Sequence, residues 1–84
     1  MKKQEVLEKY KAVKLKFNSY YKFSFAFEGK SDDGCTVLAS IGGDSDDIYR
    51  LDIYASKEET LSTLDPNYIK VTKGNDTLFE WDDY

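Results

Sequence analysis

The side chains that could do chemistry in this sequence are mainly carboxylates. The chain has sixteen Asp and Glu residues, one cysteine and no histidine. Histidine is the commonest general base and a frequent zinc ligand, and one cysteine cannot build a thiolate metal site. Two carboxylates could in principle share hydrolytic work, but no pair is singled out by its spacing. We therefore expect no enzymatic activity, no metal and no cofactor.

The densest acidic run follows two glycines and includes Asp44, Asp46 and Asp47. Carboxylates at alternating positions are typical of calcium loops, but that template also requires a glycine at position 6 and a glutamate at position 12. Those positions hold Tyr49 and Ala55. The run is therefore interpreted as a solvated turn.

Cys35 is interpreted as a packing residue, because no histidine is present to lower its thiol pKa and it begins a strand-like run. A small secreted domain would usually carry several cysteines in disulfides. The sequence also lacks a signal-like start and any apolar run of about 18 residues or more. These features predict a cytoplasmic protein with no membrane partner.

Charge is unevenly distributed along the chain. Residues 1–30 hold eight lysines against three glutamates, giving +5, whereas residues 31–84 hold four basic residues against thirteen acids, giving −9. The sequence pI is about 4.7. Since nucleic-acid affinity comes mainly from Lys and Arg contacts to phosphates, direct nucleic-acid binding is not expected. A basic protein partner fits the acidic balance better.

The stretch Tyr20–Glu28 has aromatic residues at every second position, and such alternation places them on one face of a β-strand. The four residues are Tyr21, Phe23, Phe25 and Phe27. Aromatic residues gathered on one face are more often core than an exposed stacking surface. We expect this strand to be central and its aromatic face to be covered.

The predicted cover is an amphipathic helix over residues 3–17, whose apolar residues recur at helical spacing: Val6, Tyr10, Val13 and Phe17. Residues 12–17 also alternate with period two, so they could instead form a strand paired with 20–28 through Asn18 and Ser19. The helix is preferred because Glu5 to Phe17 contains no turn residue. Both readings remain open.

Two further strands are predicted after a loop over residues 29–34. Cys35 to Ile41 alternates, and strand character resumes from Ile48 to Tyr54, with three residues on the expected core side: Tyr49, Leu51 and Ile53. Loops of about six residues are too short for parallel crossovers, so they predict an antiparallel meander.

The carboxyl-terminal part predicts a short helix followed by a hairpin. Ser56–Glu59 has the pattern of a capping box that would begin a helix over 57–64, with Leu61 and Leu64 facing the sheet and Pro66 ending it. Residues 68–72 and 77–81 then read as two strands, in which Ile69 and Val71 face either Leu78 or the pair Phe79 and Trp81.

The whole chain, residues 1–84, is therefore predicted to be a single α+β domain. An amino-terminal helix packs on an antiparallel sheet of about five strands, made of a meander and a carboxyl-terminal hairpin. The strand order is not predicted.

Two functions of different class remain. The first is a non-catalytic interaction module that binds a basic protein, one version of which is a stoichiometric inhibitor of the immunity or phage anti-defence type. Its expected partner-binding acids are Asp32, Asp33, Asp44, Asp46, Asp47, Glu80, Asp82 and Asp83. The alternative is a ligand-binding or enzymatic domain with a pocket between helix and sheet, lined by Tyr10, Tyr21 or Tyr49. A homodimer through an exposed strand edge is a further option.

Overall fold

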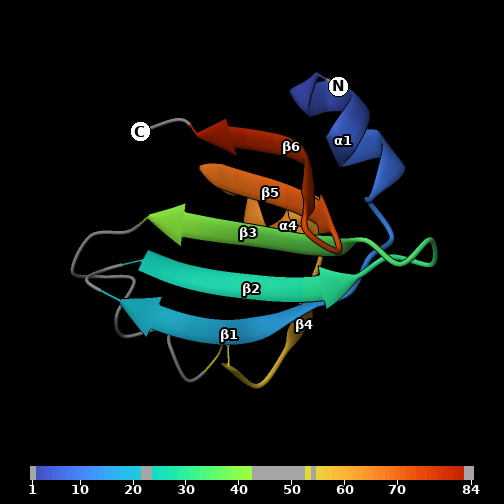
Figure 1. Ribbon diagram of the computed structural model, residues 1–84. Helices are drawn as coiled ribbons and strands as arrows, with labels where there is room; N and C mark the ends of the chain where they lie inside the picture. The colour runs from blue at the N-terminus through green and yellow to red at the C-terminus, as the bar shows by residue number, and fades with distance from the viewer. Residues whose placement is uncertain (1, 22–23, 43–52, 54, 83–84) are drawn as a thin grey trace.

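The computed structural model describes residues 2–21, 24–42, 53 and 55–82. These residues form a six-stranded antiparallel sheet with two short helices (Figure 1). The elements are α1 (Lys3–Lys9), β1 (Leu15–Tyr21), β2 (Ser24–Lys30), β3 (Thr36–Gly42), β4 (Glu58–Glu59), α4 (Leu61–Leu64), β5 (Tyr68–Lys73) and β6 (Asp76–Asp82). The strand order is β4-β1-β2-β3-β5-β6, which confirms the predicted α+β class, meander and hairpin.

The core lies on the face of the sheet that carries α4, which is the far side in Figure 1. Directly paired residues of neighbouring antiparallel strands share a face. One such row across the sheet is Phe17, Phe27, Ala39, Ile69 and Trp81. The central members of this row are fully buried, and Val6, Tyr10, Leu61 and Leu64 complete the cover from the helices and the chain that follows α1. Both helices thus contribute to one apolar layer.

The opposite face of the sheet carries polar and charged side chains. Its central row, read across the strands, is Lys16, Glu28, Leu38, Lys70 and Glu80. Figure 1 looks onto this face. The alternation of apolar and polar residues along each strand therefore separates core from surface, as expected for an antiparallel sheet with one covered face.

The predicted helix over residues 3–17 is wrong in length. The helix ends at Lys9, with Tyr10 as its C-cap, and β1 begins at Leu15. The alternative prediction, that this segment is a strand paired with the following one, is confirmed, since β1 pairs antiparallel with β2. The period-two alternation in this segment buries Leu15 and exposes Lys16, so sheet packing outweighs the helical spacing.

The predicted central strand over 20–28 is in fact parts of two strands. Tyr20 and Tyr21 end β1, while β2 begins at Ser24. The predicted turn at Asn18 and Ser19 is also wrong: both residues lie within β1, where the register with β2 shifts. The irregularity adds one residue to β1 without ending the pairing, as β-bulges do.

The aromatic face is confirmed at two of its four positions. Phe25 and Phe27 are fully buried, but Tyr21 is 69% exposed, so its predicted core position is wrong. Phe23 lies outside the described residues. Tyr21 differs because it belongs to β1 and pairs with Ser24, so it lies on the open face of the sheet, whereas its neighbour Tyr20 pairs with Phe25.

The segment after β3 is described only in part. Tyr49, Leu51 and most of the predicted 48–54 strand lie outside the described residues, whereas Ile53 is 52% exposed, so its predicted core position is wrong. Residues Glu58–Glu59 form β4, a strand that was not predicted, which pairs with Leu15 and Lys16 of β1.

The capping box predicted at Ser56–Glu59 is displaced by four residues. Thr60 and Thr63 form it instead, with the Thr60 backbone N–H donating to Thr63 Oγ1 at 2.8 Å, and the helix runs from Leu61 to Leu64. The strand pairing of residues 58–59 prevents the helix from starting earlier. Leu61 and Leu64 are buried as predicted, and Asp65 ends the helix in a left-handed conformation before the proline.

The carboxyl-terminal hairpin is confirmed, with Ile69 opposite Trp81 and Val71 opposite Phe79. This register selects the second of the two predicted pairings. Leu78 is the extra residue at a register shift and is 41% exposed. Among the described residues, no helix is long and apolar enough to cross a membrane.

Candidate functional site

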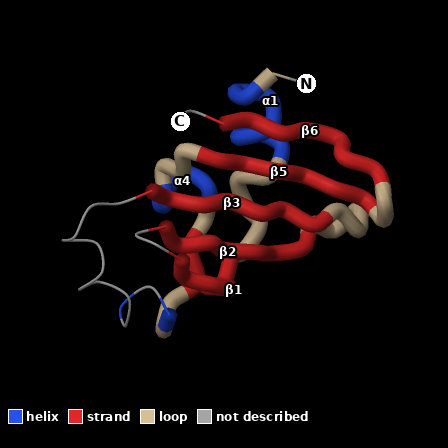
Figure 2. Tube along the Cα trace, turned by 60° about the vertical axis from the view of Figure 1, so that its left-hand side comes forward, coloured by secondary structure: helices blue, strands red, loops and turns tan. Residues whose placement is uncertain are grey.

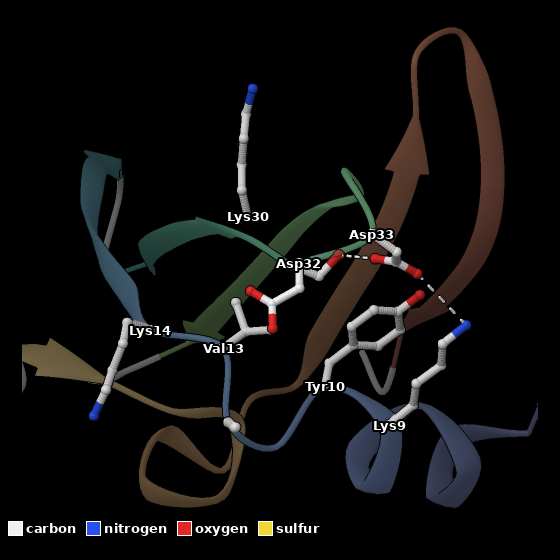
Figure 3. Close-up of a pocket in the computed structure, with 9 residues that line it drawn as sticks. Lys9, Tyr10, Val13, Lys14, Lys30, Asp32 and Asp33 are labelled. Carbon is white, nitrogen blue, oxygen red and sulfur yellow. Dashed lines mark hydrogen bonds and ion pairs between the residues drawn. The ribbon is translucent and has the colours of Figure 1, made fainter.

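An open hollow of about 390 Å³ lies between the chain that follows α1 and the loop that joins β2 to β3 (Figure 3). Its lining residues come from two segments distant in sequence: Lys9, Tyr10, Ala12, Val13 and Lys14, then Lys30, Ser31, Asp32 and Asp33. In Figure 3 the ends of Lys14 and Lys30 point away from the centre, whereas Tyr10 and Val13 contribute apolar side chains to the lining. The hollow is therefore partly apolar, with charged groups around its rim.

The loop on one side of the hollow is a compact turn held by its own polar groups. The Cys35 backbone N–H donates to Ser31 Oγ at 3.1 Å, and Gly34 takes a positive φ of 86° that closes the turn. The Ser31 hydroxyl donates to the Asp33 carboxylate, and this bond is the main reason why the pKa of Asp33 lies below its usual range. Lys9 adds an exposed ion pair with Asp33 at 3.8 Å, a contact of small energetic weight.

Tyr10 and Cys35 form a buried contact beneath the hollow. The Tyr10 side chain is 1% exposed, and its hydroxyl donates to Cys35 Sγ at 3.8 Å. Burial, followed by the interaction with Cys35, raises the pKa of the Tyr10 phenol to about 12. Cys35 itself is buried and free, which confirms its predicted role as a packing residue.

The raised pKa of Tyr10 predicts loss of stability in alkali. Between pH 10 and 12 the unfolded chain loses the phenol proton while the folded chain keeps it, so the free energy of unfolding falls as pH rises. We expect a loss of about 2 kcal/mol from this group across that interval. Urea unfolding at several pH values should show the fall, and the Tyr10→Phe variant should show a shallower one. An equal slope in both proteins would contradict the assignment.

The hollow has only some of the features expected of a ligand-binding or enzymatic pocket. It is lined by Tyr10 and contains a carboxylate with a shifted pKa, but the shift of Asp33 is downward, which keeps the group ionised. A carboxylic acid that donates a proton near neutral pH needs the opposite shift. Three lysines against two aspartates also give the rim a net positive charge.

The acids predicted to bind a partner do not form one surface among the described residues. Asp32 and Asp33 lie in the loop beside the lysines of the basic amino-terminal segment. Glu80 and Asp82 lie on β6, and Asp82 pairs with Tyr68 at the other end of the sheet from that loop. The remaining predicted acids lie outside the described residues: Asp44, Asp46, Asp47 and Asp83. Asp32 and Asp33 are thus part of a mixed-charge surface.

The second candidate site is the strand β6, which forms one end of the six-stranded order. Three of its acids are exposed, and the term acidic edge denotes them here: Asp76, Glu80 and Asp82. The Tyr68 hydroxyl donates to Glu80 Oε2 at 2.6 Å and fixes this carboxylate on the open face of the sheet. On the other face, Lys3 Nζ lies 3.7 Å from the centre of the Trp81 ring.

Sequence reasoning found Glu80 and Asp82 but missed Asp76, and it did not predict that Leu78 is exposed. The hairpin could be predicted, since Gly74 and Asn75 separate two alternating runs. The position of β6 at the end of the sheet could not, because no local residue pattern reports strand order.

In the described part of the chain, three or more His, Cys, Asp or Glu side chains nowhere gather closely enough to hold a metal ion. Comparison of the chain with protein-family models, with curated proteins and with solved structures gave no match.

Proposed function

We propose that this chain is a small, non-catalytic interaction module that binds a basic protein partner through the acidic edge of β6. The observation that carries the proposal is the position of Asp76, Glu80 and Asp82 on the exposed terminal strand of the sheet. Three carboxylates on one strand favour cationic partners and raise the rate of encounter with them.

The composition of the core supports a surface function. The buried residues that the structure describes are all apolar or aromatic, with no buried Asp, Glu, Lys or Arg among them. The side chains that are charged at neutral pH therefore lie at the surface, where water and salt weaken their effect on a bound substrate and favour recognition over catalysis.

The placement of positive charge supports a defined polarity of binding. Lys9, Lys14 and Lys30 surround the hollow, at the end of the sheet opposite to Asp82. Lys3 lies over Trp81 on the other face of β6 from Glu80 and Asp82. A basic partner is therefore repelled at the hollow and attracted to the open face of β6, which orients it during encounter. In the inhibitor version, the carboxylates occupy a basic surface that the partner uses for phosphates. The single buried, unpaired cysteine supports a reducing compartment such as the cytoplasm.

The alternative, a ligand-binding domain, has the hollow between Tyr10 and Asp32 as its supporting observation. A thermal-shift screen against metabolites distinguishes the two functions, because a bound ligand raises the melting temperature by mass action. A stabilising metabolite whose effect is lost in Asp32→Asn would favour the alternative.

The test of the proposal compares two variants with equal change in charge. The edge variant carries Asp76→Asn, Glu80→Gln and Asp82→Asn, and the control variant carries Glu5→Gln, Asp32→Asn and Asp65→Asn. Capture from a lysate at low salt identifies the partner, which is then purified for titration. We expect 1:1 binding that weakens as salt rises from about 50 to 200 mM, and a further loss of about tenfold or more in the edge variant alone. Equal losses in both variants would refute the proposal.

A further inference from the structure

We infer that the partner of β6 is an extended basic segment that joins the sheet as an additional strand, a mode that rests on the proposed function and specifies it. Strand addition uses backbone hydrogen bonds for affinity and alternate side chains for specificity. Each of these two requirements can be examined on β6.

The backbone requirement is met by the position and length of β6. Its seven residues, Asp76–Asp82, pair with β5 on one side, and no strand within residues 2–21, 24–42 and 55–82 pairs with its other side. About half of the N–H and C=O groups of such a strand point away from its one partner. Figures 1 and 2 show β6 at the border of the sheet beyond β5.

The side-chain requirement follows from the register with β5. Lys70 is opposite Glu80 and Tyr68 is opposite Asp82, which places both acids on the open face. Phe79 and Trp81 point to the other face and are half-buried, and Lys3 of α1 lies over the Trp81 ring. A strand added beside them would place one set of alternate residues next to carboxylates and the other set next to aromatic rings. Lysine or arginine alternating with valine or threonine meets both conditions.

A second copy of this chain is a poor occupant of the same edge. Antiparallel pairing of β6 with itself about Phe79 sets Asp76 opposite Asp82, and pairing about Leu78 sets Asp76 opposite Glu80. Pairing about Trp81 sets Glu80 opposite Asp82. Like charges in direct cross-strand pairs are destabilising, and charged edges are a common device against self-association. The same carboxylates that reject a second copy accept a cationic strand, so they select the partner by both effects.

The test uses a seven-residue peptide, blocked at both ends, that alternates lysine with valine or threonine. Its control has the same sequence with N-methyl groups on the central residues, which keeps the charges and removes backbone donors on both edges. We expect the parent peptide to slow amide exchange in β6 and to bind at least about tenfold more tightly than the methylated one. Glu80→Gln with Asp82→Asn should weaken the parent peptide about fivefold to tenfold, and Asp32→Asn with Asp65→Asn less than twofold.

The outcomes separate this inference from the proposed function. Equal binding of the parent and methylated peptides would overturn strand addition and leave attraction by charge intact. No binding of either peptide would also overturn strand addition, while the purified partner continues to test the function. Self-association in light scattering, with exchange protection in β6 that rises with protein concentration, would show a second copy at the edge and contradict the inference.

Discussion

Replacing Phe27 with alanine is expected to lower the free energy of unfolding by about 3 to 5 kcal/mol. The ring is fully buried at the centre of the core row and meets Phe17 edge-to-face at a centroid distance of 5.9 Å. Its removal loses apolar burial and leaves a cavity. A chain of 84 residues has a total stability of only about 4 to 12 kcal/mol, so the variant should be largely unfolded at moderate temperature.

Tyr21→Ala is the matched control, since Tyr21 belongs to the same aromatic series in the sequence but is 69% exposed. We expect it to cost less than about 1 kcal/mol, and Phe27→Leu to fall between the two. Urea unfolding followed by circular dichroism measures all three. If Tyr21→Ala were as damaging as Phe27→Ala, the placement of the core on this face would be wrong.

The contrast between these two residues shows what local pattern can predict. Alternation at Phe25 and Phe27, and at Ile69 and Val71, correctly predicts buried residues because each strand must turn one face to the core. The hairpin after Lys73 follows from Gly74, which takes a positive φ of 61°. These features depend on neighbours in sequence, and sequence shows neighbours directly.

The same pattern fails where the chain reverses without turn residues. Between Tyr21 and Ser24 the sequence has only Lys22 and Phe23, neither of which favours a turn. The alternation of aromatic residues therefore continues without a break, and it predicts one strand where the chain forms two. The length of the amino-terminal helix was mispredicted for a similar reason. Its apolar spacing continues past Lys9, and only the pairing of Leu15 with β4 and of Lys16 with β2 shows that a strand has begun.

The candidate site was less predictable than the fold. The excess of acids is visible in the composition, but their grouping is set by strand order, which brings Asp76, Glu80 and Asp82 to a sheet edge and leaves Asp32 among lysines. Strand order results from the competition of all pairings at once. A run of carboxylates in sequence is therefore a weak guide to an acidic surface.

Gly29→Ala should destabilise the protein more than other small substitutions. Whether it lowers or raises the free energy of unfolding tests the crossing of the chain over β2. A Cβ at this position would overlap the backbone carbonyl oxygen of Lys14 and lie 3.0 Å from Leu15 Cδ2. Gly29 pairs with Val37 near the loop that joins β2 to β3, and the chain that leads into β1 crosses directly over it. A backbone oxygen cannot move aside as a side chain can. We expect a loss of about 3 kcal/mol.

Without this contact the substitution should be favourable. Gly29 does not need a positive φ, so alanine would stabilise the protein by about 0.4 to 1 kcal/mol through the unfolded chain. Gly74→Ala is the control: its φ is 61° and its Cβ would meet nothing within 4 Å, so it should cost about 1 kcal/mol from backbone strain alone. Urea unfolding ranks the two variants, and amide shifts at Lys14 and Leu15 locate the damage. A Gly29→Ala protein as stable as the parent would show that the connection from α1 to β1 does not cross β2 here, and the hollow between Val13 and Asp32 would lose its basis.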